Sequence, residues 1–162
     1  MAAVDYFLKI DGIPGESMDA AHKGEIQVES FSWGETQQGT HAAGGGGGAG
    51  KVHMQDFHFV SKFNKASAVL FLACATGQHI KKAELFCRKA GGKQEEFLKV
   101  TLTDLLVSSY QTGGSGHSDI VPTGQISLNF SKIEFEYKEQ KPDGTLAGPT
   151  KAGYDAKANQ KV

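Results

Sequence analysis

The stretch QISLNFSKIEFEY, residues 125–137, decides the fold that we expect for this chain. Its apolar residues alternate as they do in a strand with one buried face, but the alternation jumps by one residue between Phe130 and Ile133. If both apolar sets face one core, the jump must absorb an extra residue. A β-bulge does this, and bulges increase the bend of a long strand.

Two other stretches show the same one-residue jump. It lies between Leu102 and Leu105 in FLKVTLTDLLVSS, and between Val28 and Phe31 in EIQVESFSWG. Repeated bending of long strands favours a closed or sharply rolled sheet over a flat sandwich. The sequence therefore predicts a mainly β protein built as a barrel.

One segment departs from strand alternation. NKASAVLFLACATGQ, residues 64–78, offers Asn64 or Ser67 as an N-terminal cap and Gly77 as a C-terminal stop. We expect a short helix there, docked on the barrel by a stripe made of Val69, Leu70 and Ala73.

Length and composition indicate one ordinary domain. The chain has 162 residues, of which 39% are hydrophobic and 22% charged, and its formal net charge is -1. We expect a single domain over residues 1–162 with neither a nucleic-acid partner nor membrane insertion. The amino terminus MAAVDYFLKI lacks the pattern of a signal peptide, and Cys74 and Cys87 lie in apolar stretches typical of reduced, structural thiols.

Glycine-rich segments mark the connections. QTGGSGHSDIVPTG, residues 111–124, is predicted to be a loop between two strands. KPDGTLAGPTKAGYD, residues 141–155, is predicted to be irregular, so we expect a C-terminal tail over residues 139–162.

The run GGGGGAGK, residues 44–51, resembles a phosphate-binding loop, for which Gly45, Gly50 and Lys51 have the required spacing. However, Val52 occupies the position where a hydroxyl must hold magnesium. The following residues, KVHMQDFHFV, are typical of a strand, whereas a phosphate loop must open a helix. A nucleotide-binding protein stays open as an alternative, and so does a β-barrel that binds a small ligand.

A search for chemistry finds no catalytic constellation. The two closest histidines, His53 and His58, are five residues apart, a spacing that sends them to opposite faces of a strand. We therefore expect no enzyme, no metal and no cofactor. The chain has six histidines, all of which we interpret as surface or structural residues: His22, His41, His53, His58, His79 and His117.

The glycine-rich loop over residues 39–52 holds seven of the 21 glycines. Such a segment has little side chain to bury and much entropy to lose on folding. A partner surface could order it, since small side chains let backbones approach closely. The alternative is a loop excursion without a role.

Two long runs, FSWGETQQGTHAAGGGGGAGKVHMQDFHFVSKFNKASAVLFLACATGQHI and LFCRKAGGKQEEFLKVTLTDLLVSSYQTGGSG, resemble the Hcp (haemolysin-coregulated protein) family of the bacterial type VI secretion system. The resemblance extends over essentially the whole chain. It implies a rolled β-barrel of two sheets with one short flanking α-helix and an extended glycine-rich hairpin. It also implies six copies in a ring, rings stacked into a tube, and export from the bacterial cytoplasm without a cleavable signal peptide.

The partners that the resemblance implies are a spike protein at the tube tip, sheath and baseplate proteins, and effectors in the lumen. It places Ser32, which alternation turns away from Phe31 and Trp33, on the wall of the lumen. It assigns the hairpin to contacts within or between rings, through Gly39, His41, Gly44, Gly45, Gly46, Gly47, Gly48, Gly50 and Lys51.

Overall fold

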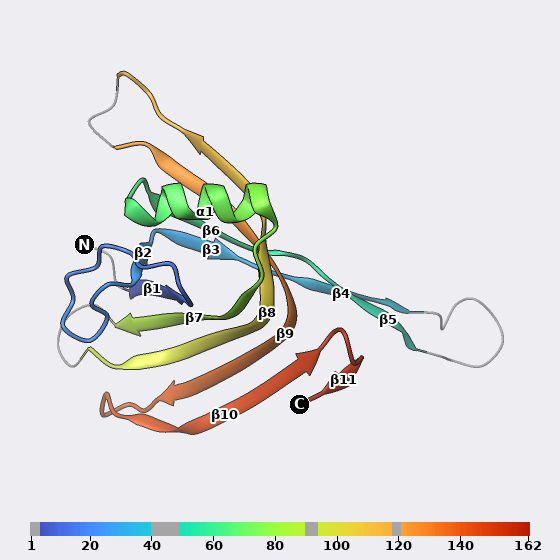
Figure 1. Ribbon diagram of the computed structural model, residues 1–162. Helices are drawn as coiled ribbons and strands as arrows, with labels where there is room; N and C mark the ends of the chain where they lie inside the picture. Colours follow the sequence, from blue (N-terminus) through green and yellow to red (C-terminus); the bar gives the residue numbers. More distant parts are fainter. Residues whose placement is uncertain (1–3, 40–48, 90–93, 118–120) are drawn as a thin grey trace.

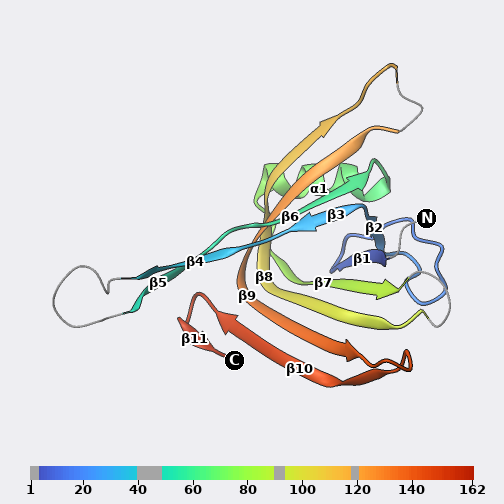
Figure 2. The ribbon, with the colours of Figure 1, turned by 180° about the vertical axis from the view of Figure 1, so that it is seen from behind.

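A computed structural model describes residues 4–39, 49–89, 94–117 and 121–162. The main sheet follows the order β11-β10-β9-β8-β7-β1-β2, and β3 joins it through β6, which pairs with β9. Figures 1 and 2 show these strands wrapped into a roll, with one helix along its side. The elements of the main sheet and the helix are β1 Val4–Ile10, β2 Ile26–Val28, β3 Ser30–Ser32, β6 Phe57–Lys62, α1 Lys65–Thr76, β7 Ile80–Lys89, β8 Glu96–Gly113, β9 Thr123–Gln140, β10 Leu146–Asp155 and β11 Gln160–Lys161.

The roll comes from a corner that β8 and β9 turn together. Leu102 pairs with Ile133, and Leu105 pairs with Phe130, so the two predicted jumps lie directly opposite each other. Before the corner β9 pairs with β6, and beyond it β9 pairs with β10. The ladder thus divides into two sheets that share β8 and β9.

The corner is not the bulge that the alternation predicts. The register between β8 and β9 is continuous from Leu102 to Val107, and it shifts only between Val107 and Ser109. Instead Asp104 adopts a left-handed backbone with φ of 51°, a conformation that aspartate tolerates better than most residues. The apolar alternation of β8 and that of β9 change face at positions that pair with each other. Neither strand therefore needs an extra residue at the corner.

The third jump, between Val28 and Phe31, separates β2 from β3. Glu29 lies between the two strands, and its backbone N–H donates to the carbonyl of Val60 in β6 at 2.8 Å. β2 and β3 follow each other in the chain, but β2 pairs with β1 and β3 pairs with β6. The ladder of hydrogen bonds is therefore interrupted between β2 and β3. The predicted mainly β, rolled architecture is confirmed.

One hydrophobic core fills the roll. The largest fully buried side chains come from both sheets and from the helix, so burial of their apolar surface stabilises the whole domain. They are Phe57, Phe59, Leu8, Ile26, Leu70, Leu85, Leu102, Leu105, Ile126, Leu128, Val100 and Val107.

The predicted helix forms with the predicted caps. The Asn64 side chain accepts from the Ala66 N–H at 2.8 Å, and Ser67 completes a reciprocal capping box. Gly77 ends the helix in the left-handed conformation, with φ of 62°. The expected stripe is wrong at one position, because Val69 is exposed and the buried face is Ala66, Ser67, Leu70 and Ala73.

The prediction of an irregular C-terminal tail over residues 139–162 is also wrong. β9 continues to Gln140, and Leu146–Asp155 form β10, which pairs with β9 along most of its length. After a short turn, β11 pairs back with β10, and the Val162 N–H donates to the carbonyl of Gly153 at 3.1 Å. The end of the described chain therefore belongs to the sheet.

Candidate functional site

The most distinctive feature of the surface is a hairpin that projects from the body. β4, Glu35–Gly39, and β5, Ala49–Met54, pair only with each other in the described residues. Figures 1 and 2 show the pair reaching away from the roll. Such a two-stranded ribbon buries little apolar surface of its own, so it contributes little to the core.

The hairpin shows how much of the predicted loop is ordered strand. Gly39 ends β4, and Gly50 and Lys51 lie in β5, so the predicted loop over residues 39–52 is shorter than expected. The Lys51 side chain is exposed. The other predicted contact residues lie outside the described residues: His41, Gly44, Gly45, Gly46, Gly47 and Gly48.

Trp33 fastens the base of the hairpin to the body. Its indole N–H donates to the carbonyl of Gln55 at 2.9 Å, and the Gln55 N–H donates to the carbonyl of Gly34 at the same distance. The indole ring lies 5.7 Å from the ring of Phe135 and 6.2 Å from that of Phe130. The projecting strands thus start from a well-packed anchor.

A polar face runs across β3, β6 and β9. Ser32 pairs with His58, and His58 pairs with Ser127, so the three residues form one row across the strands. The His58 Nδ1 and the Ser127 Oγ are hydrogen-bonded at 2.6 Å. Ser32 is exposed while Phe31 packs against the core, as alternation predicts.

This row lies in a shallow hollow of about 510 Å³. Besides apolar residues, its lining carries hydroxyl and carboxamide side chains, and His58 is its one titratable residue. The hollow is therefore a hydrogen-bonding surface. Its lining residues are Ser30, Phe31, Ser32, His58, Phe59, Val60, Ser109, Gln111, Gln125, Ile126 and Ser127.

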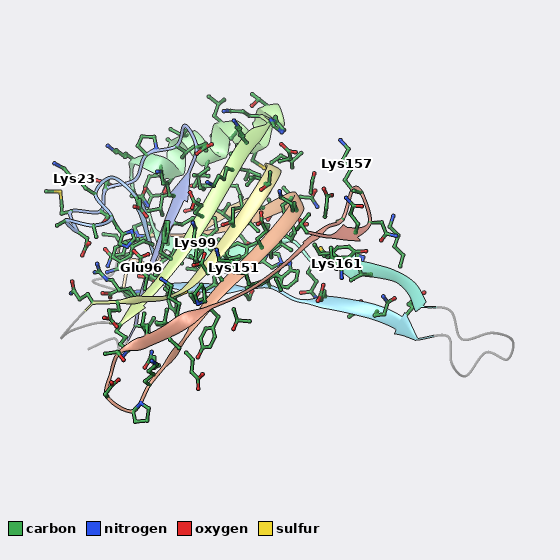
Figure 3. The ribbon with its side chains drawn as sticks, turned by 90° about the horizontal axis from the view of Figure 1, so that it is seen from below. Lys23, Glu96, Lys99, Lys151, Lys157 and Lys161 are labelled. Carbon is green, nitrogen blue, oxygen red and sulfur yellow. The ribbon has the colours of Figure 1, made fainter. Side chains whose placement is uncertain are left out.

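The face of β7, β8 and β9 that lies away from the core carries charges of both signs. Lys99 Nζ lies 3.0 Å from Glu84, and Lys132 Nζ lies 3.5 Å from Glu134. The hydrogen bond with Glu84 raises the pKa of Lys99. Figure 3 shows Lys99 between Glu96 and Lys151 on this side of the molecule.

Sequence reasoning missed a buried polar cluster under the segment between β1 and β2. The Arg88 guanidinium, only 3% exposed, donates to both carboxylate oxygens of Asp19, at 2.9 and 2.6 Å. This hydrogen bonding lowers the pKa of Asp19 to about 2. The buried His22 ring stacks on Phe7 with a centroid distance of 4.4 Å. These contacts fasten the segment to the sheet, which is a structural role.

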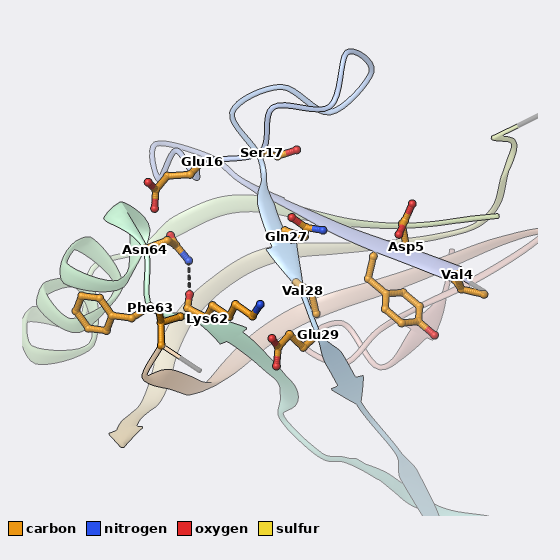
Figure 4. Close-up of a pocket in the computed structure, with 12 residues that line it drawn as sticks. Val4, Asp5, Glu16, Ser17, Gln27, Val28, Glu29, Lys62, Phe63 and Asn64 are labelled. Carbon is orange, nitrogen blue, oxygen red and sulfur yellow. Dashed lines mark hydrogen bonds between the residues drawn. The ribbon is translucent and has the colours of Figure 1, made fainter. Parts of the chain in front are cut away.

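A cleft of about 570 Å³ opens where β1, β2 and the end of β6 meet (Figure 4). Three carboxylates line it, together with one lysine, Lys62. The exposed side chains of Phe63 and Val121 lie at the same opening, and both are about half exposed. The carboxylates are Asp5, Glu16 and Glu29.

Potential metal-ligating side chains are spread out in the described parts of the chain. In those residues no three histidine, cysteine, aspartate or glutamate side chains gather as metal ligands would. Burial raises the pKa of the Cys87 thiol to about 12, which keeps it protonated and unreactive. The one helix among these residues has 12 residues and is not long enough to cross a membrane.

A rolled β-barrel with a separate, projecting hairpin has the architecture of an assembly subunit, because the hairpin presents exposed strand without contributing to the core. Comparison with known proteins is consistent with this class. The family described as "Type VI secretion system effector, Hcp" matches residues 7–137. Protein hcp1 of Pseudomonas aeruginosa is 46% identical over 159 residues, which cover 97% of this chain and 98% of that protein.

Solved structures agree. Hcp1 from Salmonella typhimurium superimposes with a TM-score of 0.82 at 40% identity, covering 99% of this chain and 100% of that one. A structure described as a type six secretion system protein gives a TM-score of 0.92 at 31% identity, with the same coverage. The chain belongs to the Hcp family of the type VI secretion system. Its role is that of a structural subunit of the secretion tube.

Proposed function

We propose that the chain closes into rings of six copies, and that these rings stack into a tube which the contractile apparatus expels. The observation that carries the proposal is the hairpin of β4 and β5, which forms its own sheet and extends away from the barrel. A surface that reaches beyond the domain on one side and meets a different surface of the next copy makes a heterologous contact. Such contacts form closed rings or open stacks.

In this tube the polar face across β3, β6 and β9 lines the lumen, and the charged face of β7 to β9 forms the outer wall. Two observations support this division. The hollow around Ser32 offers hydroxyl, carboxamide and imidazole groups that suit varied protein cargo, whereas the opposite sheet carries the ion pairs that suit water or charged sheath proteins. Effectors travel inside, a spike protein caps the tip, and sheath and baseplate proteins surround the tube.

The mass of the native particle tests the ring. Native mass spectrometry of the purified protein at micromolar concentration is expected to show six copies or multiples of six. A spectrum that contains monomer alone across this range contradicts the proposal, since closure of a ring requires an interface between copies.

Substitution of Ser32 tests the lumen assignment. Ser32→Glu and Ser32→Gln are expected to leave the fold and the ring intact, because exposed substitutions change the free energy of unfolding by about 0.5 kcal/mol or less. They are expected to impair effector export, measured by secretion from the native bacterium. Ser115→Glu, at an exposed loop residue that does not line the hollow, is the control. Normal effector export by both Ser32 variants contradicts the assignment.

A further inference from the structure

The hairpin and the cleft lie at opposite ends of the same two strands. β3 leads into β4 through Trp33 and Gly34, and β5 leads into β6 through Gln55 and Asp56, so the hairpin extends one end of the β3–β6 pair. The cleft lies at the other end of this pair, lined by Glu29 before β3 and by Lys62 where β6 stops. A projection and a hollow thus stand at the two ends of one short ladder.

The two ends also differ in charge. The cleft presents three carboxylates against one ammonium, a lining with a formal excess of two negative charges. Of the three, Asp5 lies 3.4 Å from the Arg88 guanidinium, and Glu16 accepts from the backbone N–H of Lys65 at 2.9 Å. Glu29 is exposed and forms no ion pair within the described residues.

The hairpin brings the complementary charge. Glu35 lies at the base of the hairpin, where β4 begins. Beyond it, between Thr36 and Val52, the sequence has a single formally charged side chain, Lys51. It is exposed in β5, and the residue after it, Val52, is half-buried. A lysine side chain combines an ammonium group with a long apolar stem, which matches a cleft that sets carboxylates beside the half-exposed Phe63 and Val121.

We propose that the hairpin of one copy docks at this cleft of a copy in the next ring, with the Lys51 ammonium against Glu29 and its stem against Phe63 and Val121. The inference rests on the proposed function, in that it names the surface that receives the hairpin when copies assemble. The hairpin and the cleft are different surfaces at opposite ends of one copy. A copy whose hairpin is bound still has its cleft free for another copy, so the contact can repeat. Opposite charges at the two ends also fix the polarity of the assembly.

Zero-length cross-linking tests the pairing. A carbodiimide joins an amine only to a carboxylate in direct contact, and mixing 14N- and 15N-labelled protein identifies bonds between copies. We expect a mixed-isotope peptide pair that joins Lys51 to Glu29. Assembled particles in which Lys51 joins only carboxylates outside the cleft overturn the inference and leave the proposed function standing. Monomer alone overturns both.

Charge reversal gives a second, independent test. Lys51→Glu and Glu29→Lys are each expected to eliminate particles larger than a single ring, and the double variant is expected to restore them, because it recreates the pair with its charges exchanged. Lys81→Glu, an equal change at an exposed lysine of β7, is the control and is expected to assemble as the parent does. Failure of the double variant to regain assembly, or normal assembly of both single variants, overturns the inference.

Discussion

Replacement of residues 37–52 by an Asn-Gly turn is expected to abolish the stacking of rings and secretion while the barrel still folds. β4 and β5 pair only with each other in the described residues, and Thr36 pairs with His53, so this pair can close a shortened hairpin. A change of loop length alters the free energy of unfolding only slowly, by about 0.6 kcal/mol per doubling. The anchor at Trp33 and Gln55 remains in place.

Thermal unfolding measures the first half of this expectation, and electron microscopy of assembled particles together with a secretion assay measures the second. A matched control keeps the length of the hairpin and exchanges Gln37 and Gln38, both exposed, for threonine. Tubes of normal length from the shortened protein rule out an assembly role for the hairpin. A large fall in unfolding temperature shows instead that the hairpin supports the core.

Leu70→Ala is expected to destabilise the protein strongly. Leu70 is 1% exposed and lies on the face of α1 that meets the barrel, where α1 contacts β8. Truncation of a fully buried leucine leaves a cavity and typically costs roughly 2–5 kcal/mol. Urea denaturation should therefore show a lower midpoint with little change in slope.

Leu72→Ala is the matched control, because it makes the same chemical change in the same helix at a side chain that is 57% exposed. The gain in helix propensity is equal in both variants, so the difference between their midpoints reports burial alone. The expected cost at Leu72 is about 0.5 kcal/mol or less. Equal midpoints for the two variants contradict the packing of α1 against the barrel.

The rolled fold follows from the sequence because its cause is local. The phase of alternation on each side of the corner is visible in the letters around Phe130 and Ile133. The jump in β8 lies opposite the jump in β9. This depends on the register between the two strands, which the structure shows and the sequence does not. The predicted bend is present, but the prediction that a bulge causes it was wrong.

The strand near the C-terminus escaped prediction for a physical reason. None of the residues of β10 is buried, so its sequence has no alternation to show. Its Pro149 and its glycines argue against a central strand. β10 tolerates them because, on the side facing away from β9, β11 pairs only with Tyr154 and Asp155, so the rest of that side is a free edge within the described residues.

The candidate surfaces divide in the same way. The exposure of Ser32 follows from alternation between two aromatic residues, and the structure bears it out. The cleft and the Arg88–Asp19 pair could not be predicted from the sequence, because each joins segments far apart in the chain. Arg88 and Asp19, for example, are 69 positions apart. Single-sequence patterns describe one strand or helix at a time, and such sites arise only from their packing.

The corner in β8 and β9 has a mechanical consequence for the subunit of an expelled tube that we propose. Each strand is 18 residues long and runs without a break from one sheet of the barrel into the other, a contour of roughly 60 Å at about 3.3 Å per residue. A compressive load on one sheet therefore passes to the other along covalent backbone and a shared ladder. Sliding the two sheets past each other would require both strands to buckle, which gives the subunit shear stiffness that loosely stacked sheets lack.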